Sequence, residues 1–473
     1  MSFAQQRLWF LQHLEPDNAF YNIPGAVRLE GRLRVDLLER TFAEMVRRHE
    51  ILRTTFTLLE KQPVQIIGEP VAHTLPLLDL SDLPAFERGA ETKRCVEAEA
   101  ARPFDLERGP LLRVQLLRLS LEEHVLLVTM HHIVSDGWSV GLFVREVAAI
   151  YAAYLRSEES PLAELPIQYA DFAHCQRTWL QGEVLSTQLA YWLAELTGAP
   201  TVLNLPLDRP RLKSTEHHAA THSLEIPVGL MHALKQLGQE RDTTLFMVLH
   251  ASFLSLLHYH TDEVDIVIGT DVANRDKVEL EGLIGFFVNQ LVLRVNVSGD
   301  PAFEELLVRV RKVALGAYSH QHLPFDALVE TLNPERSMLH SPLFQVKLVL
   351  QNTPLPPMEL SGLTLNLLEV EPETAKFDLM FTLREDATGL KCKIEYSTGL
   401  FDATTITRMA SGLVKILGHI VEYPTARLSE ISKLLADLDT QQQSTLQAEF
   451  KGMRREKLKN LVPTPIVSQI GQG

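Results

Sequence analysis

Cysteine is scarce in this chain, whose 473 residues include only Cys95, Cys175 and Cys392. The three lie far apart and form no CxxC pair, so the sequence predicts neither a disulfide framework nor a cysteine-based zinc site. Isolated thiols in an odd number are typical of a reducing compartment, and we expect a cytoplasmic protein.

An excess of positive charge is also missing. The 45 Lys and Arg residues are outnumbered by 60 Asp and Glu residues, which gives a formal net charge of -15. Nucleic acid is therefore not an expected partner, because binding to a phosphate backbone relies on clustered Lys and Arg side chains.

Long apolar runs are absent as well. The most apolar stretch, residues 244–260, is interrupted by histidines and falls short of the roughly 20 residues that span a bilayer. The first residues, MSFAQQRLWFLQHLEPD, lack the basic segment, apolar core and small-residue cleavage site of a signal peptide. The sequence therefore predicts no membrane association.

What the chain does have is a hydrophobic content of 45% and alternating helical and strand-like patterns, which together predict a layered α/β architecture. In the first half, helical spacing covers residues 35–49 and 138–155, and β-forming runs cover residues 51–59, 111–120 and 124–130. In the second half we expect helices at residues 176–196, 244–260, 302–321 and 403–421, and strands at residues 264–272, 344–352, 376–386 and 390–398.

These patterns divide the chain into three parts. We expect a first lobe over residues 1–175, a second lobe over residues 176–435, and a polar and basic tail or linker over residues 436–473. Residues 205–220 are polar and contain proline, and are predicted to form an exposed connecting segment. The tail is interpreted as a solvated helix with a frayed end, and no chemistry is assigned to it.

The residues most suggestive of chemistry are His131, His132, Asp136 and Gly137, where a strand-like run meets the start of a helix. Successive strand residues point to opposite faces, so only one of the two histidines can face a given cleft and the other supports it. Asp136 stands at the expected helix N-cap, and the free N–H groups of the helix start could stabilise an oxyanion.

Two other interpretations of the histidine pair are weaker. A second pair, His217 and His218, lies in the polar connector without a preceding strand, so pairing alone indicates little. Two histidines and a carboxylate can bind iron, but adjacent histidines on a strand diverge and chelate poorly. We predict no metal site.

The segment HHIVSDG matches the HHxxxDG signature, and the whole chain resembles a condensation domain of a nonribosomal peptide synthetase, in the chloramphenicol acetyltransferase-like superfamily. Further blocks similar to those of the family follow in order, and the resemblance covers residues 2 to about 435. These blocks are SFAQQRLWFL (2–11), RHEILRTTF (48–56), YADFAHCQRTWL (169–180), GTDVANRDKVELEGLIGFFVNQLVLR (269–294), HQHLPFD (320–326) and RSMLHSPLFQV (336–346).

The resemblance implies two chloramphenicol acetyltransferase-like lobes that form a V-shaped pseudo-dimer, with the active site in a tunnel between them. It implies that His132 is the catalytic histidine, with His131 beside it, and that Gly137 leaves an opening next to the acceptor. Asp136 and Arg275 are implied to pair as structural support of the site.

The implied reaction is peptide bond formation, in which the α-amine of an acceptor aminoacyl thioester attacks a donor acyl or peptidyl thioester. Both substrates are attached to 4'-phosphopantetheine arms of carrier proteins, so the chain itself is expected to bind no cofactor. The implied partners are an upstream donor carrier, a downstream acceptor carrier and a neighbouring adenylation domain of an antibiotic or other secondary-metabolite synthetase. A monomer is expected.

Several departures and alternatives remain open. Cys175, His322 and the pair Leu339 and His340 differ from the residues usual in the family, which puts local packing and substrate preference in doubt. A starter domain that acylates the first amino acid with a fatty acyl group has the same motif. A non-catalytic recruitment platform is a further alternative, although its motif is typically damaged. The segments SFAQQRLWFL and YNIP resemble the subgroup that accepts an L-configured donor.

Overall fold

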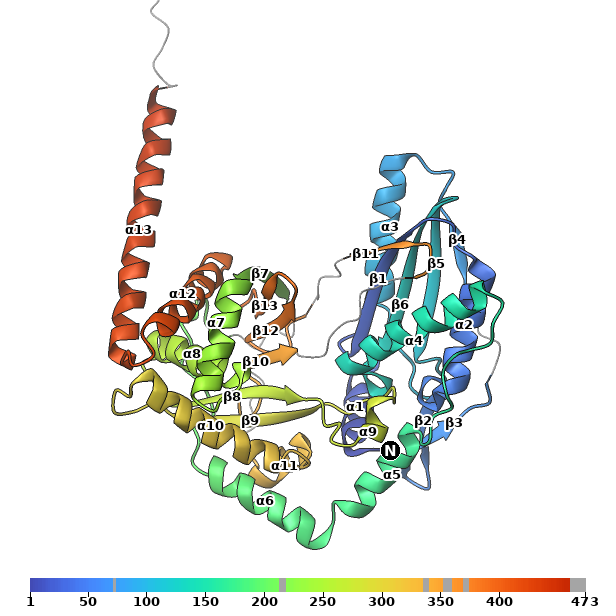
Figure 1. The fold of residues 1–473 in the computed structure, drawn as a ribbon, viewed down its shortest axis with the longest axis horizontal. Helices are drawn as coiled ribbons and strands as arrows, with labels where there is room; N and C mark the ends of the chain where they lie inside the picture. Colours follow the sequence, from blue (N-terminus) through green and yellow to red (C-terminus); the bar gives the residue numbers. More distant parts are fainter. Residues whose placement is uncertain (71–73, 212–217, 335–339, 352–359, 369–373, 460–473) are drawn as a thin grey trace, which may run out of the picture.

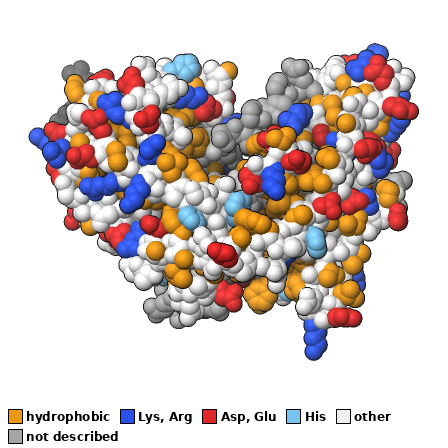
Figure 2. Space-filling model, turned by 60° about the horizontal axis from the view of Figure 1, so that its bottom comes forward, with side chains coloured by type: hydrophobic (Ala, Val, Ile, Leu, Met, Phe, Trp, Pro, Cys, Tyr) orange, Lys and Arg blue, Asp and Glu red, His pale blue; other side chains and the backbone are white. Residues whose placement is uncertain are grey.

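The computed structural model describes residues 1–70, 74–211, 218–334, 340–351, 360–368 and 374–459. Two lobes, each built on one main sheet backed by helices, form the arms of a V (Figure 1). The space-filling view shows a hollow between them (Figure 2). The predicted α/β architecture of two lobes is confirmed.

The first lobe contains a five-stranded sheet in the order β11-β1-β6-β5-β4. Its strands are β1 (Asn22–Glu30), β4 (Leu77–Asp79), β5 (Leu112–Ser120), β6 (Glu123–His131) and β11 (Thr364–Leu368). The hairpin of β2 (Thr54–Leu59) and β3 (Gln62–Ile67) lies apart from it. The helical elements are α1 (Phe3–Leu14), α2 (Val35–Arg48), η1 (Glu50–Arg53), α3 (Ala85–Ala100), η2 (His132–Val134), α4 (Gly137–Leu155) and α5 (Tyr169–Trp179).

The second lobe contains a six-stranded sheet in the order β7-β13-β12-β10-β8-β9. Its strands are β7 (Ala219–Pro227), β8 (Asp265–Val272), β9 (Asn289–Asn296), β10 (Val346–Gln351), β12 (Leu379–Asp386) and β13 (Gly389–Ser397). The helices are α6 (Gly182–Leu196), α7 (Val228–Glu240), α8 (Leu245–Thr261), α9 (Val278–Glu281), α10 (Phe303–Ser319), α11 (Phe325–Leu332), α12 (Ala403–Glu422) and α13 (Leu428–Lys459).

The strand register of the first lobe sets up the functional site. Strands β1 and β6 are antiparallel, and Asn22 at the start of β1 pairs with His131 at the end of β6. The main-chain N–H of the next residue, His132, donates to the carbonyl of Tyr21 at 2.8 Å. The end of β6 is therefore anchored to the start of β1, and the chain turns there into η2 and α4.

Helix α4 packs its apolar face against the first-lobe core, as its helical spacing predicts. Phe143, Val147 and Ile150 are buried in the same hydrophobic cluster as residues of β5 and β6. By length and composition alone α4 could cross a membrane, but a buried core helix has the same length and apolar character. Its packing in the lobe accounts for that character.

The second half of the chain also contributes to the first lobe. Strand β11 pairs with β1, and Leu280, Leu283, Ile284 and Phe287 join the first-lobe hydrophobic cluster. A strand and a loop from beyond residue 175 thus cover the first lobe, and the division at residue 175 stays a prediction.

One predicted helix is wrong. Residues 176–196 do not form a continuous helix, because α5 ends at Trp179 and α6 begins at Gly182. Gly182 has a positive φ of 54°, which favours glycine, and Leu180 is buried at the break. Helices α5 and α6 run at different angles along the base of the V (Figure 1), so the bend carries the chain from one lobe to the other.

Parts of other sequence-based predictions lie outside the described residues, including residue 352 of the expected strand at 344–352 and residues 336–339 of the block RSMLHSPLFQV. The connector at residues 205–220 includes residues 212–217, among them His217, and Leu339 lies in residues 335–339. The tail is helical as far as Lys459, and residues 460–473 are outside the described part.

Candidate active site

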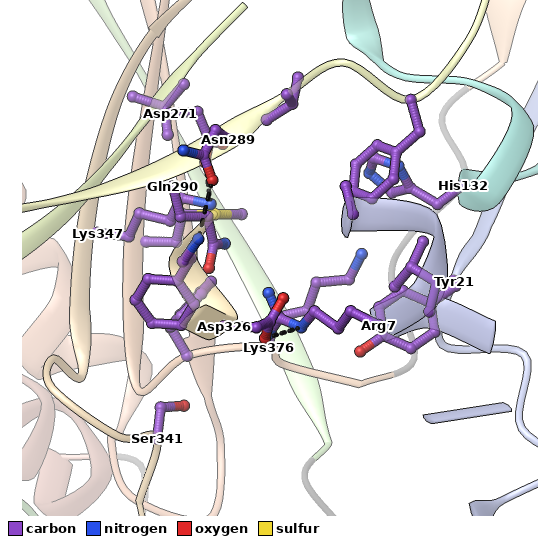
Figure 3. Close-up of a pocket in the computed structure, with 18 of the residues that line it drawn as sticks. Arg7, Tyr21, His132, Asp271, Asn289, Gln290, Asp326, Ser341, Lys347 and Lys376 are labelled. Atoms are coloured by element: carbon purple, nitrogen blue, oxygen red, sulfur yellow. Dashed lines mark hydrogen bonds and ion pairs between the residues drawn. The ribbon is translucent and has the colours of Figure 1, made fainter. Parts of the chain in front are cut away.

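A cavity of about 480 Å³ lies between the two lobes and takes its lining from both. His132, Tyr21 and Arg7 come from the first lobe, whereas Lys347 and Lys376 come from the second. Figure 3 shows His132 on one wall with the polar side chains of the second lobe facing it across the cavity. The remaining wall is largely apolar and includes Leu8, Leu11, Phe20, Phe286, Phe344, Phe377 and Met380.

His132 is the motif histidine that reaches this cavity. Its ring meets Phe286, from the loop that covers the first lobe, edge-on, with ring centroids 4.7 Å apart. Burial, helped by the nearby positive charge of Lys376, lowers the pKa of His132 to about 3. The imidazole is therefore neutral at physiological pH and able to accept a hydrogen bond or a proton.

His131 points the other way, into the first-lobe interior, and is only 1% exposed. Its Nδ1 accepts a hydrogen bond from the backbone N–H of Ile133 at 3.1 Å, and its ring lies near Phe104 and Tyr21. Because Nδ1 is an acceptor, the neutral ring carries its proton on Nε2. The divergence expected for adjacent strand residues is confirmed, and His131 is placed to hold the turn that presents His132.

Asp136 caps helix α4, as the sequence predicts. One carboxylate oxygen accepts hydrogen bonds from the backbone N–H and the hydroxyl of Ser139, at 2.8 and 2.7 Å. The other accepts the backbone N–H of Phe287 from the second half of the chain at 3.0 Å. The Arg275 guanidinium lies 3.4 Å from this carboxylate, and both side chains are at most 1% exposed.

Arg275 and Ser139 extend this pair into a network that joins the two halves of the chain. Arg275 donates to the hydroxyl of Ser139 at 2.9 Å and to the carbonyls of Leu280 and Leu283. Ser139 also accepts the N–H of Gly285 at 3.0 Å. The 280–287 loop is therefore fixed to the start of α4, and Phe286 is brought against His132.

Tyr169 holds the same loop from the other side. Its hydroxyl donates to the carbonyl of Phe286 at 2.6 Å and lies 2.9 Å from the Ser2 hydroxyl. A Cβ at Gly285 would lie 2.0 Å from the Tyr169 ring, so only glycine fits there. Gln5 in turn donates to the carbonyl of Ile133 at 3.1 Å. Segments that are distant in the sequence thus meet around the motif.

Gly137 is exposed and forms the first residue of α4. A Cβ at this position would have no heavy atom within 4 Å. The cavity lining includes His132 but not Gly137 among the described residues. The glycine therefore leaves free space at the start of the helix, next to the turn that carries His132.

The charged groups of the cavity were missed by sequence reasoning. Arg7 forms an ion pair with Asp326 across the lobes at 3.1 Å, and Lys347 lies 2.7 Å from Asp271. Lys376 also lines the cavity. A lysine inside the apolar run FQVKLVLQ was the available signal for Lys347, which is buried. No comparable signal marked Lys376 at the start of a strand-like run.

Two of the departures from the family pattern lie together, away from His132. Cys175 and His322 both line a groove of about 320 Å³ beside Trp179 and Asp276. His322 meets Trp179 edge-on and lies 3.6 Å from the Asp276 carboxylate. The groove is separate from the residues that surround His132.

Comparisons with known proteins agree with this arrangement. The condensation-domain family model matches residues 1–443. A linear gramicidin synthase protein from Brevibacillus parabrevis is 46% identical over 439 residues, which cover 92% of this chain and 6% of that protein. The chain thus spans a small part of this relative's length.

Solved structures have the same fold. The X-domain from teicoplanin biosynthesis superposes with a TM-score of 0.81 at 29% identity, covering 91% of this chain and 96% of the other. The first condensation domain of the CDA synthetase has a TM-score of 0.76 at 21% identity, covering 91% and 97%. The second likeness supports the fold alone.

Proposed function

This chain belongs to the condensation-domain family of nonribosomal peptide synthetases, and we propose that it forms an amide bond between two carrier-bound substrates. The α-amine of an acceptor aminoacyl thioester attacks the carbonyl of a donor acyl or peptidyl thioester. The observation that carries the proposal is the neutral His132 imidazole in the cavity between the lobes.

His132 acts mainly by hydrogen bonding and positioning the amine. An α-amine has a pKa of about 7.7 to 8.0 and is partly deprotonated near neutral pH. An imidazole whose pKa is lowered to about 3 is a weak base, so complete proton transfer to it is disfavoured. It remains a good hydrogen-bond acceptor for the attacking N–H, and holding the two substrates together supplies the larger rate advantage.

The other motif residues support this geometry. Asp136 and Arg275 fix the start of α4 to the 280–287 loop, and His131 holds the turn before it. Gly137 gives the acceptor arm room beside His132. These residues position the substrates and the catalytic imidazole.

The substrates imply the partners. An upstream carrier delivers the donor and a downstream carrier delivers the acceptor, each on a phosphopantetheine arm, and an adenylation domain loads the acceptor. The reaction needs no cofactor bound by this chain, because the thioester already supplies an activated carbonyl and a thiolate leaving group.

A non-catalytic recruitment platform is the second candidate, favoured by the similarity to the teicoplanin X-domain, which has also been solved in complex with OxyB. The intact HHIVSDG segment with His132 in the cavity favours catalysis over this alternative. A starter role, with a fatty acyl donor, differs only in the donor.

A condensation assay with loaded carriers tests the proposal. The chain is mixed with a donor carrier that bears an L-residue, a D-residue or a fatty acyl group, and with an aminoacyl acceptor carrier. Mass spectrometry then follows acyl transfer to the acceptor. We expect transfer from the L-configured donor; transfer from the fatty acyl donor alone identifies a starter domain. No transfer from any donor, together with capture of a partner protein, supports the recruitment platform instead.

A further inference from the structure

Lys376 is a cation in the cavity that lacks a counterion among the described residues. It precedes β12 on the second-lobe wall, and Figure 3 shows its side chain extending into the cavity. The other two cavity cations, Arg7 and Lys347, each have a carboxylate within 3.1 Å. In the described part of the chain, no carboxylate comes within ion-pair distance of Lys376, although Glu395 and Asp271 exert a weaker attraction.

The surroundings of Lys376 are aromatic. Its ammonium lies 5.2 Å from the centroid of the Phe20 ring and 5.7 Å from that of Tyr21. Burial lowers the pKa of Lys376 to about 8, so the side chain is still mainly charged at pH 7. Aromatic faces compensate a desolvated cation only in part, and a charge in such a site is suited to bind an anionic group that arrives with the substrate.

Lys376 and His132 also share one cavity. It is the charged residue with the largest effect on His132, whose pKa it helps to lower. The two residues come from opposite lobes and line one cavity. A thioester carbonyl attacked by an amine that His132 holds would lie between them.

We infer that Lys376 donates a hydrogen bond to the carbonyl oxygen of the donor thioester and stabilises the oxyanion that forms there. The inference rests on the proposed function. The acceptor nitrogen forms a bond to the carbonyl carbon while the carbonyl π electrons move onto oxygen. The C–S bond then breaks, the carbonyl re-forms, and the phosphopantetheine thiolate leaves and takes up the proton lost by the amine. Lys376 keeps its own proton throughout.

The charge of the cavity fits this role. Three cationic side chains, Arg7, Lys347 and Lys376, face two carboxylates, Asp271 and Asp326. The surplus of one positive charge matches the negative charge that develops on the carbonyl oxygen as the amine adds. A fixed cation in a desolvated site stabilises such a charge more than water does, because it needs no reorientation during the reaction.

The test compares Lys376→Met with Lys376→Arg in the carrier-based assay. We expect Lys376→Met to lower kcat about 10- to 1,000-fold with little change in KM for either carrier, as for loss of an oxyanion donor. Lys376→Arg keeps a charged donor and should retain more activity. Lys393→Met, which removes an exposed lysine from neighbouring strand β13, is the matched control and should react like the wild type.

Melting temperature and acceptor choice distinguish this role from its rivals. Removal of an unpaired, half-buried charge should leave the melting temperature of Lys376→Met unchanged or raised. A lowered value, repeated in Lys376→Gln, indicates a structural role and overturns the inference. A rate loss confined to acceptors with Asp or Glu side chains also overturns the inference, because Lys376 would then bind a substrate carboxylate.

The wild type separates this inference from the proposed function. If the wild type transfers nothing, the proposed function fails and the inference fails with it. An active wild type with an equally active Lys376→Met refutes the inference alone.

Discussion

The Asp136 carboxylate lies 3.4 Å from the Arg275 guanidinium, although 139 positions of the chain separate the two residues. Both side chains are at most 1% exposed, and Asp136 also accepts the backbone N–H groups of Ser139 and Phe287. The pair therefore joins the helix that follows the turn carrying His132 to a loop from the other half of the chain.

Asp136→Ala should destabilise the protein by about 3 to 5 kcal/mol, because it leaves a buried guanidinium without its counterion. Thermal unfolding measures the effect, and condensation activity should fall with it. The matched control is Glu122→Ala, which breaks an ion pair with Arg32 at the same 3.4 Å distance but with side chains 66% and 92% exposed. This control should cost less than about 1 kcal/mol. Equal losses in the two variants would contradict a structural role for Asp136.

His132→Ala should lower the rate of condensation at least about 100-fold, because the attacking amine loses its hydrogen-bond acceptor. The melting temperature should stay close to that of the wild type, and His174→Ala, at an exposed position of α5, is the control. His132→Gln retains a hydrogen-bonding side chain but no base. More activity in His132→Gln than in His132→Ala supports positioning, whereas equal activity supports proton transfer. Near wild-type turnover in His132→Ala would contradict the proposal that His132 is the catalytic residue.

Gly137→Ala tests the space at the start of α4. A Cβ at this position meets no heavy atom within 4 Å, and alanine is a better helix former than glycine, so stability should be unchanged or slightly raised. Turnover should fall, with KM for the acceptor carrier rising, since the methyl group occupies the room left for the arm. A Cβ at Gly229, near the start of α7, also meets open space, so Gly229→Ala should alter neither turnover nor KM for the acceptor carrier. If Gly137→Ala has the same KM for the acceptor carrier as the wild type, Gly137 does not line the path of the acceptor arm.

His250 gives the protein an acid-sensitive core. It is 0% exposed, both ring nitrogens lack a hydrogen-bond partner among the described residues, and burial lowers its pKa to about 3. An unfolded histidine has a pKa of about 6.5. Unfolding therefore takes up a proton between these values, so stability is full above about pH 6.5 and falls as the pH drops through this window.

The His250→Leu variant isolates this contribution. The free energy of unfolding of His250→Leu minus that of the wild type should increase by about 2 kcal/mol when the pH is lowered from 7.5 to 5. This value corresponds to the roughly 1.5 pH units between the unfolded-state pKa of about 6.5 and pH 5. Denaturant unfolding at the two pH values measures the difference. His174→Leu, at an exposed site, should show a much smaller pH-dependent change in the free energy of unfolding. A difference between His250→Leu and the wild type that does not depend on pH would show that the pKa of His250 is the same in the folded and unfolded states, and would contradict the prediction.

Local features of the sequence predicted most elements. Helical spacing predicted a helix over 35–49, and α2 covers Val35–Arg48. The motif was expected where a strand meets a helix, and β6 ends at His131 with Asp136 capping α4. These features were readable because side-chain periodicity and N-capping depend on residues within a few positions of each other.

Other features were not readable from local patterns. The break between α5 and α6 was missed because residues 176–196 have continuous helical spacing, and the connection between the lobes decides where the chain bends. The pairing of β11 with β1 was also missed, since more than 300 residues separate these strands. The cavity cations were overlooked because a lysine beside a strand is most often solvated.

The sequence by itself determined that one of two adjacent histidines would face a cleft beside a capped helix, because alternation along a strand and hydrogen bonds at a helix start are local. The resemblance added the pairing of Asp136 with Arg275, which no spacing rule predicts. Only the tertiary structure decided that Phe286 packs against His132 and that Lys376 enters the same cavity. The reason is physical: these residues are far apart in the sequence, and their distances are set by how the two sheets and the 280–287 loop pack.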